Sequence, residues 1–187
     1  MPNSIIKEFK LLFYLLSASK AMSKGDVTHA RRRLDSALAT LDEQSEYLAL
    51  ALAMDGLLIS LEVAFASIDD EDKNLDGSLA RFKESLDLVS HSVDADDLYV
   101  AEFCRFHLKI DEIFNGSKIT FFELQAAEAR LLEARDKSTR ARHVLRHIMS
   151  GFTIEPLREF CVVPKQDDAP KDNFRKGPSP NVTVTFG

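Results

Sequence analysis

The feature that most constrains the fold is a run at residues 47–68 that is apolar almost throughout. Its sequence, YLALALAMDGLLISLEVAFASI, contains two charged side chains, Asp55 and Glu62. A helix of this composition is stable in water when neighbouring elements bury it. The run is also long enough to cross a bilayer, but two carboxylates near its middle would each be costly in lipid. We therefore expect it to be the central helix of a soluble body.

The overall composition fits one helical domain. The chain has 187 residues, of which 45% are hydrophobic, so it can bury most of its apolar surface in a single core. It contains 7 glycines and 6 prolines, and every proline except Pro2 lies at position 156 or later. Because so little interrupts a helix before that point, the composition favours an all-α fold.

Charge and cysteine content limit the function classes. The formal net charge is −6, and the excess of Asp and Glu lies in residues 1–100. This balance is atypical of a general nucleic-acid-binding protein. The two cysteines, Cys104 and Cys161, are too few for a disulfide scaffold and match no zinc motif. The expected location is a reducing compartment, the cytoplasm.

Hydrophobic periodicity divides the chain into successive helices. Asp26 and Asp94 are the expected N-caps of the second and fifth helices, Gly25 ends the first, and Asn115-Gly116 ends the fifth. The predicted helices cover residues 4–23, 26–41, 47–68, 78–91, 95–114 and 120–150.

Two connections carry different signals. Residues 42–45 predict a break, although no glycine or proline enforces it and one helix over 26–68 is an alternative. The acidic run IDDEDKNLDG at residues 68–77 predicts a solvated loop before the fourth helix.

The first predicted helix has one broad apolar face. Large apolar residues stand at positions 5, 6, 9, 12, 13 and 16, a spacing that places them on one side of a helix. We expect this side to pack against the core. The stretch also resembles a weak signal peptide, but Glu8 interrupts its positively charged start, so an amphipathic helix is favoured.

The first two predicted helices resemble one tetratricopeptide-type repeat. In its second helix that family has Gly-Asp or Gly-Asn, then an alanine, a large residue four positions later and a small residue three after that. The matching residues here are Gly25-Asp26, Ala30, Leu34 and Ala37, with Tyr14 and Ala18 in the first helix. Ser17 and Ala21 depart from the pattern, which has leucine and tyrosine there.

This resemblance implies a stack of antiparallel helical hairpins that binds a peptide or protein in a concave groove. A later small-large-small spacing at Ser78, Phe82 and Ser85 lacks the glycine. The alternative architecture is therefore an irregular helical bundle.

The last predicted helix, over residues 120–150, has the most regular pattern. Small and large apolar residues alternate at steps of three and four, a spacing typical of close packing along a partner helix. This helix could lie within the chain or on a second subunit, which would make a homo-oligomer through the 124–148 seam. The seam consists of Leu124, Ala127, Leu131, Ala134, Ser138, Ala141, Leu145 and Ile148.

The composition changes near the end of the chain. We expect a helical domain over residues 1–163 and an extended or disordered tail over residues 164–187, because the tail is rich in proline and charge and poor in core residues. Its final NVTVTFG alternates like a β-strand that could add to the edge of a partner's sheet.

Three sets of titratable residues could carry chemistry. Asp55 and Glu62 lie on one face of an apolar helix, where each could titrate or instead pair with Arg or Lys of a neighbouring helix. His143 and His147 have a spacing that suits a metal, but no further ligand motif accompanies them.

The third set is Cys104, His107 and Asp111, which share a helical face. None of the three sets completes a catalytic motif, so we expect no enzyme activity, metal or cofactor.

The last helix also carries a basic stretch. The candidate partner-binding residues are Arg130, Arg135, Arg140, Arg142 and Arg146, with Arg31–Arg33 as a further contribution. No aromatic residue alternates with these arginines, so RNA or DNA is less favoured than a protein partner.

The sequence therefore predicts a soluble, all-α, non-catalytic protein-protein interaction module, such as an adaptor, chaperone-like, regulatory or inhibitor protein. A nucleic-acid-binding protein and a small helical-bundle metalloenzyme are the alternatives.

Overall fold

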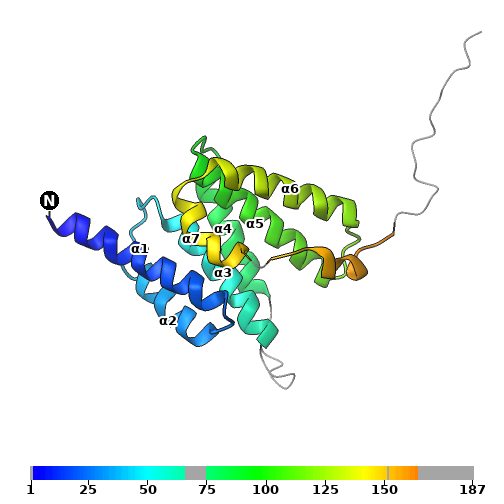
Figure 1. The fold of residues 1–187 in the computed structure, drawn as a ribbon, viewed down its shortest axis with the longest axis horizontal. Helices are drawn as coiled ribbons and strands as arrows, with labels where there is room; N and C mark the ends of the chain where they lie inside the picture. Colours follow the sequence, from blue (N-terminus) through cyan, green and yellow to red (C-terminus); the bar gives the residue numbers. More distant parts are fainter. Residues whose placement is uncertain (1, 66–74, 151, 164–187) are drawn as a thin grey trace, which may run out of the picture.

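The computed structural model describes residues 2–65, 75–150 and 152–163, and this part of the chain is helical apart from its connections (Figure 1). The predicted all-α fold class is confirmed. The elements are α1 (Pro2–Met22), α2 (Val27–Leu38), α3 (Leu48–Phe65), α4 (Asp76–Val89), α5 (Ala95–Phe114), α6 (Phe121–Lys137), α7 (Arg140–Met149) and the short 3-10 helix η1 (Glu155–Phe160).

The α1–α2 hairpin forms where predicted. Gly25 has φ +72°, which favours glycine, and it turns the chain directly after α1. The Asp26 side chain accepts a hydrogen bond of 3.0 Å from the His29 backbone N–H and caps α2. α1 begins at Pro2 rather than near Ser4.

α3 lies at the centre of the body and packs against α1, α2, α4 and α5. The predicted break before it is present, since α2 ends at Leu38 and α3 begins at Leu48. All residues from Ala49 to Leu58 are buried, but burial decreases toward the C-terminal end, where Phe65 is 63% exposed. Gly56 allows close approach to α4, because a Cβ there would lie 3.0 Å from the Phe82 ring.

α3 is also the one helix among the described residues that is long and apolar enough to cross a membrane. More than half of this segment is buried inside the fold. Such burial is consistent with the core helix of a soluble protein.

α4, α5 and α6 form the second half of the body. The side chain of Asp94 accepts hydrogen bonds from the backbone N–H groups of Asp96 and Asp97 and caps α5, as predicted. At the other end Gly116, with φ +79°, ends α5. The largest fully buried side chains of this region are Phe82, Tyr99, Phe103 and Phe106.

The prediction of one helix over residues 120–150 is wrong. α6 ends at Lys137, Ser138 adopts an extended conformation with ψ 153°, and α7 begins at Arg140. The carboxylate of Asp96, on α5, accepts hydrogen bonds from Ser138 Oγ (2.5 Å) and from the backbone N–H groups of Thr139 (2.9 Å) and Ala141 (3.0 Å). These bonds replace those that a continuous helix would make.

The side chains of the 124–148 seam therefore belong to two helices. α6 packs against α5, whereas α7 packs against α1 and α5, so the seam has its partner helices within one chain. The most deeply buried seam residues are Leu124, Ala127, Leu131, Ser138, Ala141 and Leu145.

η1 closes the described part of the chain against the start of α6. The Val162 backbone N–H donates to the Ile119 carbonyl at 2.9 Å, and the Arg158 guanidinium lies 4.0 Å from the centre of the Phe121 ring. The predicted tail at 164–187 and residues 68–74 of the predicted acidic loop lie outside the described residues. The predicted end of that loop is wrong, because α4 begins at Asp76 and not at Ser78.

Candidate functional site

The most unusual surface of the molecule is the outer side of α1. Four large apolar side chains on it are exposed to solvent: Ile5 (65%), Ile6 (53%), Phe9 (75%) and Phe13 (59%). Figure 1 shows that the N-terminal part of α1 extends beyond the helices that cover its C-terminal part. Exposed clusters of this kind mark interaction surfaces on soluble proteins.

This arrangement corrects the prediction for the first helix. The sequence pattern assigned residues 5, 6, 9 and 13 to the core side, but the buried large residues of α1 are Leu11, Leu15 and Met22. α1 is thus apolar on two sides, and α2, α3 and α7 cover one of them. In the described part of the chain no helix packs over the outer side, and Arg33 of α2 borders it.

A shallow groove of about 460 Å³ runs along this outer side. Its lining consists of Ile5, Ile6, Phe9, Lys10, Phe13, Tyr14 and Arg33. We call this set the α1 groove.

The charges of the α1 groove are positive. The guanidinium of Arg33 lies 5.6 Å from the centre of the Phe13 ring, and its Nε donates to His29 Nε2 at 3.4 Å. No carboxylate in the described segments lies within ion-pair distance of Arg33 or Lys10. The nearby Lys7 instead faces Asp42, at 3.6 Å, on another side of α1.

Three of the five predicted partner-binding arginines are engaged in ion pairs within the chain. Arg130 lies 3.4 Å from Glu102, and Arg135 lies 3.0 Å from Asp136. Arg140 contacts both Glu46 (2.5 Å) and Asp96 (3.1 Å).

The other two, Arg142 and Arg146, are exposed and have no carboxylate partner among the described residues. The α2 arginines, Arg31–Arg33, lie apart from Arg130 and Arg135 of α6. α2 packs against α1 and α3, whereas α6 packs against α5 on the far side of the body (Figure 1). Arg130, Arg135 and Arg140 therefore belong to separate local ion pairs, whereas Arg142 and Arg146 on α7 form none among the described residues.

The two acids of α3 form a charge cluster with arginines of neighbouring helices, which is one of the two alternatives considered above. Asp55 is 3% exposed and contacts Arg31 of α2 at 2.5 Å and Arg81 of α4 at 2.8 Å. Glu62 accepts two hydrogen bonds from Arg31, of 2.9 and 2.7 Å. The bond to Glu62 is the main reason that the pKa of Arg31 is raised above its ordinary value. This cluster ties α2, α3 and α4 together.

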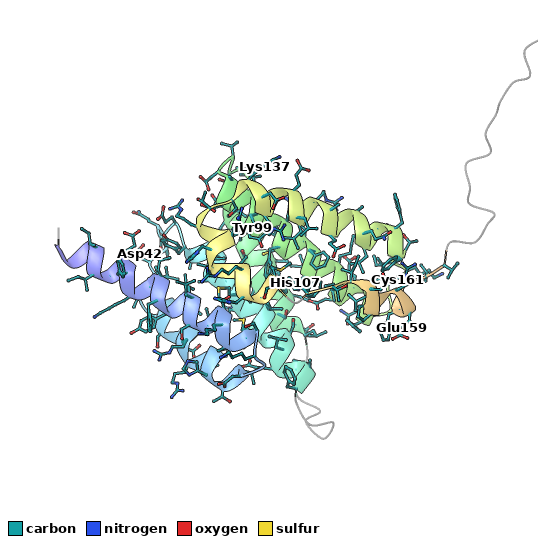
Figure 2. The ribbon with its side chains drawn as sticks, viewed as in Figure 1. Asp42, Tyr99, His107, Lys137, Glu159 and Cys161 are labelled. Atoms are coloured by element: carbon teal, nitrogen blue, oxygen red, sulfur yellow. The ribbon has the colours of Figure 1, made fainter. Side chains whose placement is uncertain are left out.

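The Cys104, His107 and Asp111 set is buried in the interior. Figure 2 shows His107 in the middle of the body, and the rings of Phe82, Phe103, Phe106 and Phe152 surround its imidazole with centroid distances of 4.4 to 6.1 Å. Burial lowers the pKa of His107 to about 4.

The neighbouring polar groups of this set are also poorly solvated. Burial raises the pKa of Asp111 to about 6 and that of Cys104 to about 12, so the Cys104 thiol is a weak nucleophile. His107 Nε2 and Asp111 Oδ2 have no hydrogen-bond partner among the residues that the structure describes.

The described residues contain no group of three or more His, Cys, Asp or Glu side chains that could hold a metal ion. His143 is exposed and His147 is half-buried on the surface of α7. Cys161 directly follows η1 near the edge of the body in Figure 2, Cys104 is buried, and both thiols are free.

No protein-family model matches the sequence, and neither the curated proteins nor the solved structures contain a match.

Proposed function

We propose that the protein is a non-catalytic protein-protein interaction module of the cytoplasm and that the α1 groove is its binding surface. The observation that carries the proposal is the exposure of Ile5, Ile6, Phe9 and Phe13 side by side on α1. Complete burial of a side chain of this size contributes roughly 1.5–3 kcal/mol, so covering two or three of them would support specific association.

Three further observations support the proposal. The arginines that could have bound nucleic acid are largely paired with carboxylates of the same chain. The buried thiol, imidazole and carboxyl of α5 lie in the core, away from every described surface groove. Free cysteines suit the reducing cytoplasm.

The tetratricopeptide resemblance also supports the proposal. The residues that carry it on α2, Ala30, Leu34 and Ala37, are all buried where α2 packs in the α1–α2 hairpin. We propose that this hairpin serves, as in that family, to present a helix surface to another protein, with adaptor, chaperone-like, regulatory and inhibitory roles all compatible with it.

Quantitative affinity purification from the native cell tests the proposal. Wild-type chain is compared with the double variant Phe9→Ser/Phe13→Ser, which removes both exposed rings and leaves the buried side of α1 unchanged. Phe122→Ser is the matched control, because Phe122 is also a helical phenylalanine and is 76% exposed on α6. We expect specific partners to be depleted at least tenfold by the double variant and retained by the control.

Equal recovery of every partner by wild type and the double variant would show that the α1 groove is not the binding surface. Thermal unfolding of both variants is the folding control, and we expect each free energy of unfolding to stay within about 1 kcal/mol of wild type because the removed rings are exposed.

A further inference from the structure

The chemistry of the α1 groove indicates what kind of partner it takes. Its lining combines four exposed apolar side chains with Lys10 and Arg33, and it contains no carboxylate. This local positive charge stands on a chain with a formal net charge of −6. A complementary partner therefore needs an apolar surface bordered by negative charge.

The shape of the exposed row favours a helix. Ile5, Phe9 and Phe13 are spaced by four residues and lie on one face of α1, over about 12 Å of helix axis. A second helix laid along this row would contact it with residues at i, i+3, i+4 and i+7. The row thus matches roughly two turns of an amphipathic helix.

Arg33 can bind a carboxylate at the edge of the partner helix. Its guanidinium packs by Phe13 and its Nε is directed to His29, while its terminal nitrogens make no hydrogen bond within the described part of the chain. A carboxylate can accept hydrogen bonds from these nitrogens while its helix covers the aromatic ring.

We propose that the α1 groove binds an amphipathic helix of another protein that carries Asp or Glu beside its apolar residues. This inference rests on the proposed function and specifies its ligand. In the complex, the apolar residues of the partner helix cover Phe9 and Phe13, and its acids face Lys10 and Arg33.

A second copy of the chain fits this surface less well. A symmetric dimer places the same patch on both sides of the interface, so Lys10 and Arg33 would meet a groove of the same positive charge. An anionic membrane also fits less well, since the chain carries a formal net charge of −6.

The test is a selection with the full chain as target and a displayed library of helical peptides as probe. The library keeps apolar residues at i, i+3, i+4 and i+7 and varies the flanking positions among Asp, Glu, Lys, Gln and Ser. Selected peptides are synthesised, and their binding is measured by fluorescence anisotropy. We expect Asp or Glu to be enriched at the flanks.

Variants of the chain locate the binding. We expect Phe9→Ser/Phe13→Ser to weaken binding of the selected peptides at least tenfold, and Phe122→Ser to leave it unchanged. The charge reversal Lys10→Glu/Arg33→Glu should weaken the acidic peptides by about tenfold and strengthen versions with Lys in place of each flanking acid. A merely structural role of Arg33 would not produce this exchange of preference, and circular dichroism confirms that each variant is folded.

The outcomes separate this inference from the proposed function. Peptides that lose binding with Phe9→Ser/Phe13→Ser but show no acidic preference would overturn the inference and leave the proposed function intact. Peptides indifferent to both double variants, or no selected peptide at all, would count against both. A dimer in sedimentation equilibrium that Phe9→Ser/Phe13→Ser dissociates, or binding to phosphatidylserine vesicles in place of peptides, would assign the groove to a different occupant.

Discussion

The His107 and Asp111 side chains are the least well accommodated polar groups of the core. They stand one turn apart on α5 and are 7% and 6% exposed, and each has an atom without a hydrogen-bond partner in the described part of the chain. Burial moves their pKa values in opposite senses, to about 4 for His107 and about 6 for Asp111. Both shifts favour the neutral side chain and therefore have opposite effects on the pH dependence of stability.

The contributions of His107 and Asp111 to the free energy of unfolding should change in opposite directions and nearly cancel between pH 4 and 6. His107 titrates at about 4 when folded and 6.5 when unfolded, so its contribution decreases as pH falls through this range. Asp111 titrates at about 6 when folded and 3.8 when unfolded, so its contribution increases as pH falls. Over its full titration range, each group changes the free energy of unfolding by about 3 kcal/mol.

We expect Asp111→Asn to remove this compensation. The variant should be about 1–3 kcal/mol more stable than wild type at pH 7, because it no longer holds a buried carboxylate, and should lose stability as pH falls from 6.5 to 4. Urea unfolding across this pH range measures both effects. A wild-type stability that changes steeply between pH 4 and 6, with the same slope in the variant, would show that these two groups do not set it.

The arginines around Asp55 are not equivalent. Arg31 contacts Asp55 and makes two bonds to Glu62, and its side chain is 29% exposed. Arg81 contacts Asp55 and the exposed Glu84, and its side chain is 40% exposed. We expect Arg31→Met to cost about 3 kcal/mol, because it leaves two acids without their main cation.

Arg81→Met is the matched control and should cost about 1 kcal/mol, because Asp55 keeps Arg31. Denaturant unfolding of both variants at pH 7 measures the difference. Equal losses would mean that Arg31 and Arg81 share the charge of Asp55 evenly.

At the scale of the helices, the junction of α6 and α7 depends on Asp96. Burial alone would raise the pKa of this carboxyl, but hydrogen bonds from Ser138, Ala141 and Thr139 outweigh it and lower the pKa to about 2. The charged form is thus favoured in the fold, and its contribution to stability is present above pH 3.8 and is lost as pH falls toward 2.

We expect Asp96→Ala to destabilise the protein by about 2 kcal/mol at pH 7 and to have a smaller effect at pH 2, where wild type has also lost much of this contribution. Asp136→Asn is the control, because Asp136 is exposed and pairs with its neighbour Arg135, and it should change stability by less than about 0.5 kcal/mol. Thermal unfolding at both pH values makes the comparison. A loss at pH 2 as large as at pH 7 would show that the carboxylate charge is not what caps α7.

The same junction shows how far local sequence determines the elements. The caps at Asp26 and Asp94 and the stops at Gly25 and Gly116 involve neighbouring residues, and they were predicted. The α6–α7 break was not, because the seam continues through it at the same spacing and the group that ends α6, Asp96, is 42 positions from Ser138. Ser138 and Thr139 prefer helix ends, but that preference is weak beside a regular apolar pattern.

At the scale of the whole molecule, the candidate site could not be recognised from the sequence, because its side chains are apolar like those of the core. The residues of α1 were correctly expected in a helix, but two of its sides are apolar, and periodicity does not tell which side the neighbours cover. In the structure α2, α3 and α7 cover Leu11 and Leu15, and Phe9 and Phe13 are left outside. The tertiary arrangement alone distinguishes a core face from a binding face.

The predicted domain boundary at residue 163 concerns the whole domain as a folding unit. The described core ends with Phe152 against Phe106 at 5.4 Å, the buried Ile154 and the Val162–Ile119 backbone bond, and Val163 is 87% exposed. A chain that ends at Val163 should therefore keep its free energy of unfolding within about 1 kcal/mol of the full chain.

A chain that ends at residue 151 is the control. It loses Phe152 and Ile154, whose removal should cost about 3–5 kcal/mol or more because Phe106 and His107 lose ring contacts. Denaturant unfolding of the three chains gives the comparison. If the chain ending at Val163 were as destabilised as the shorter one, residues 164–187 would belong to the folded domain, and the α1 groove would have to be considered together with a segment of its own chain that reaches the body.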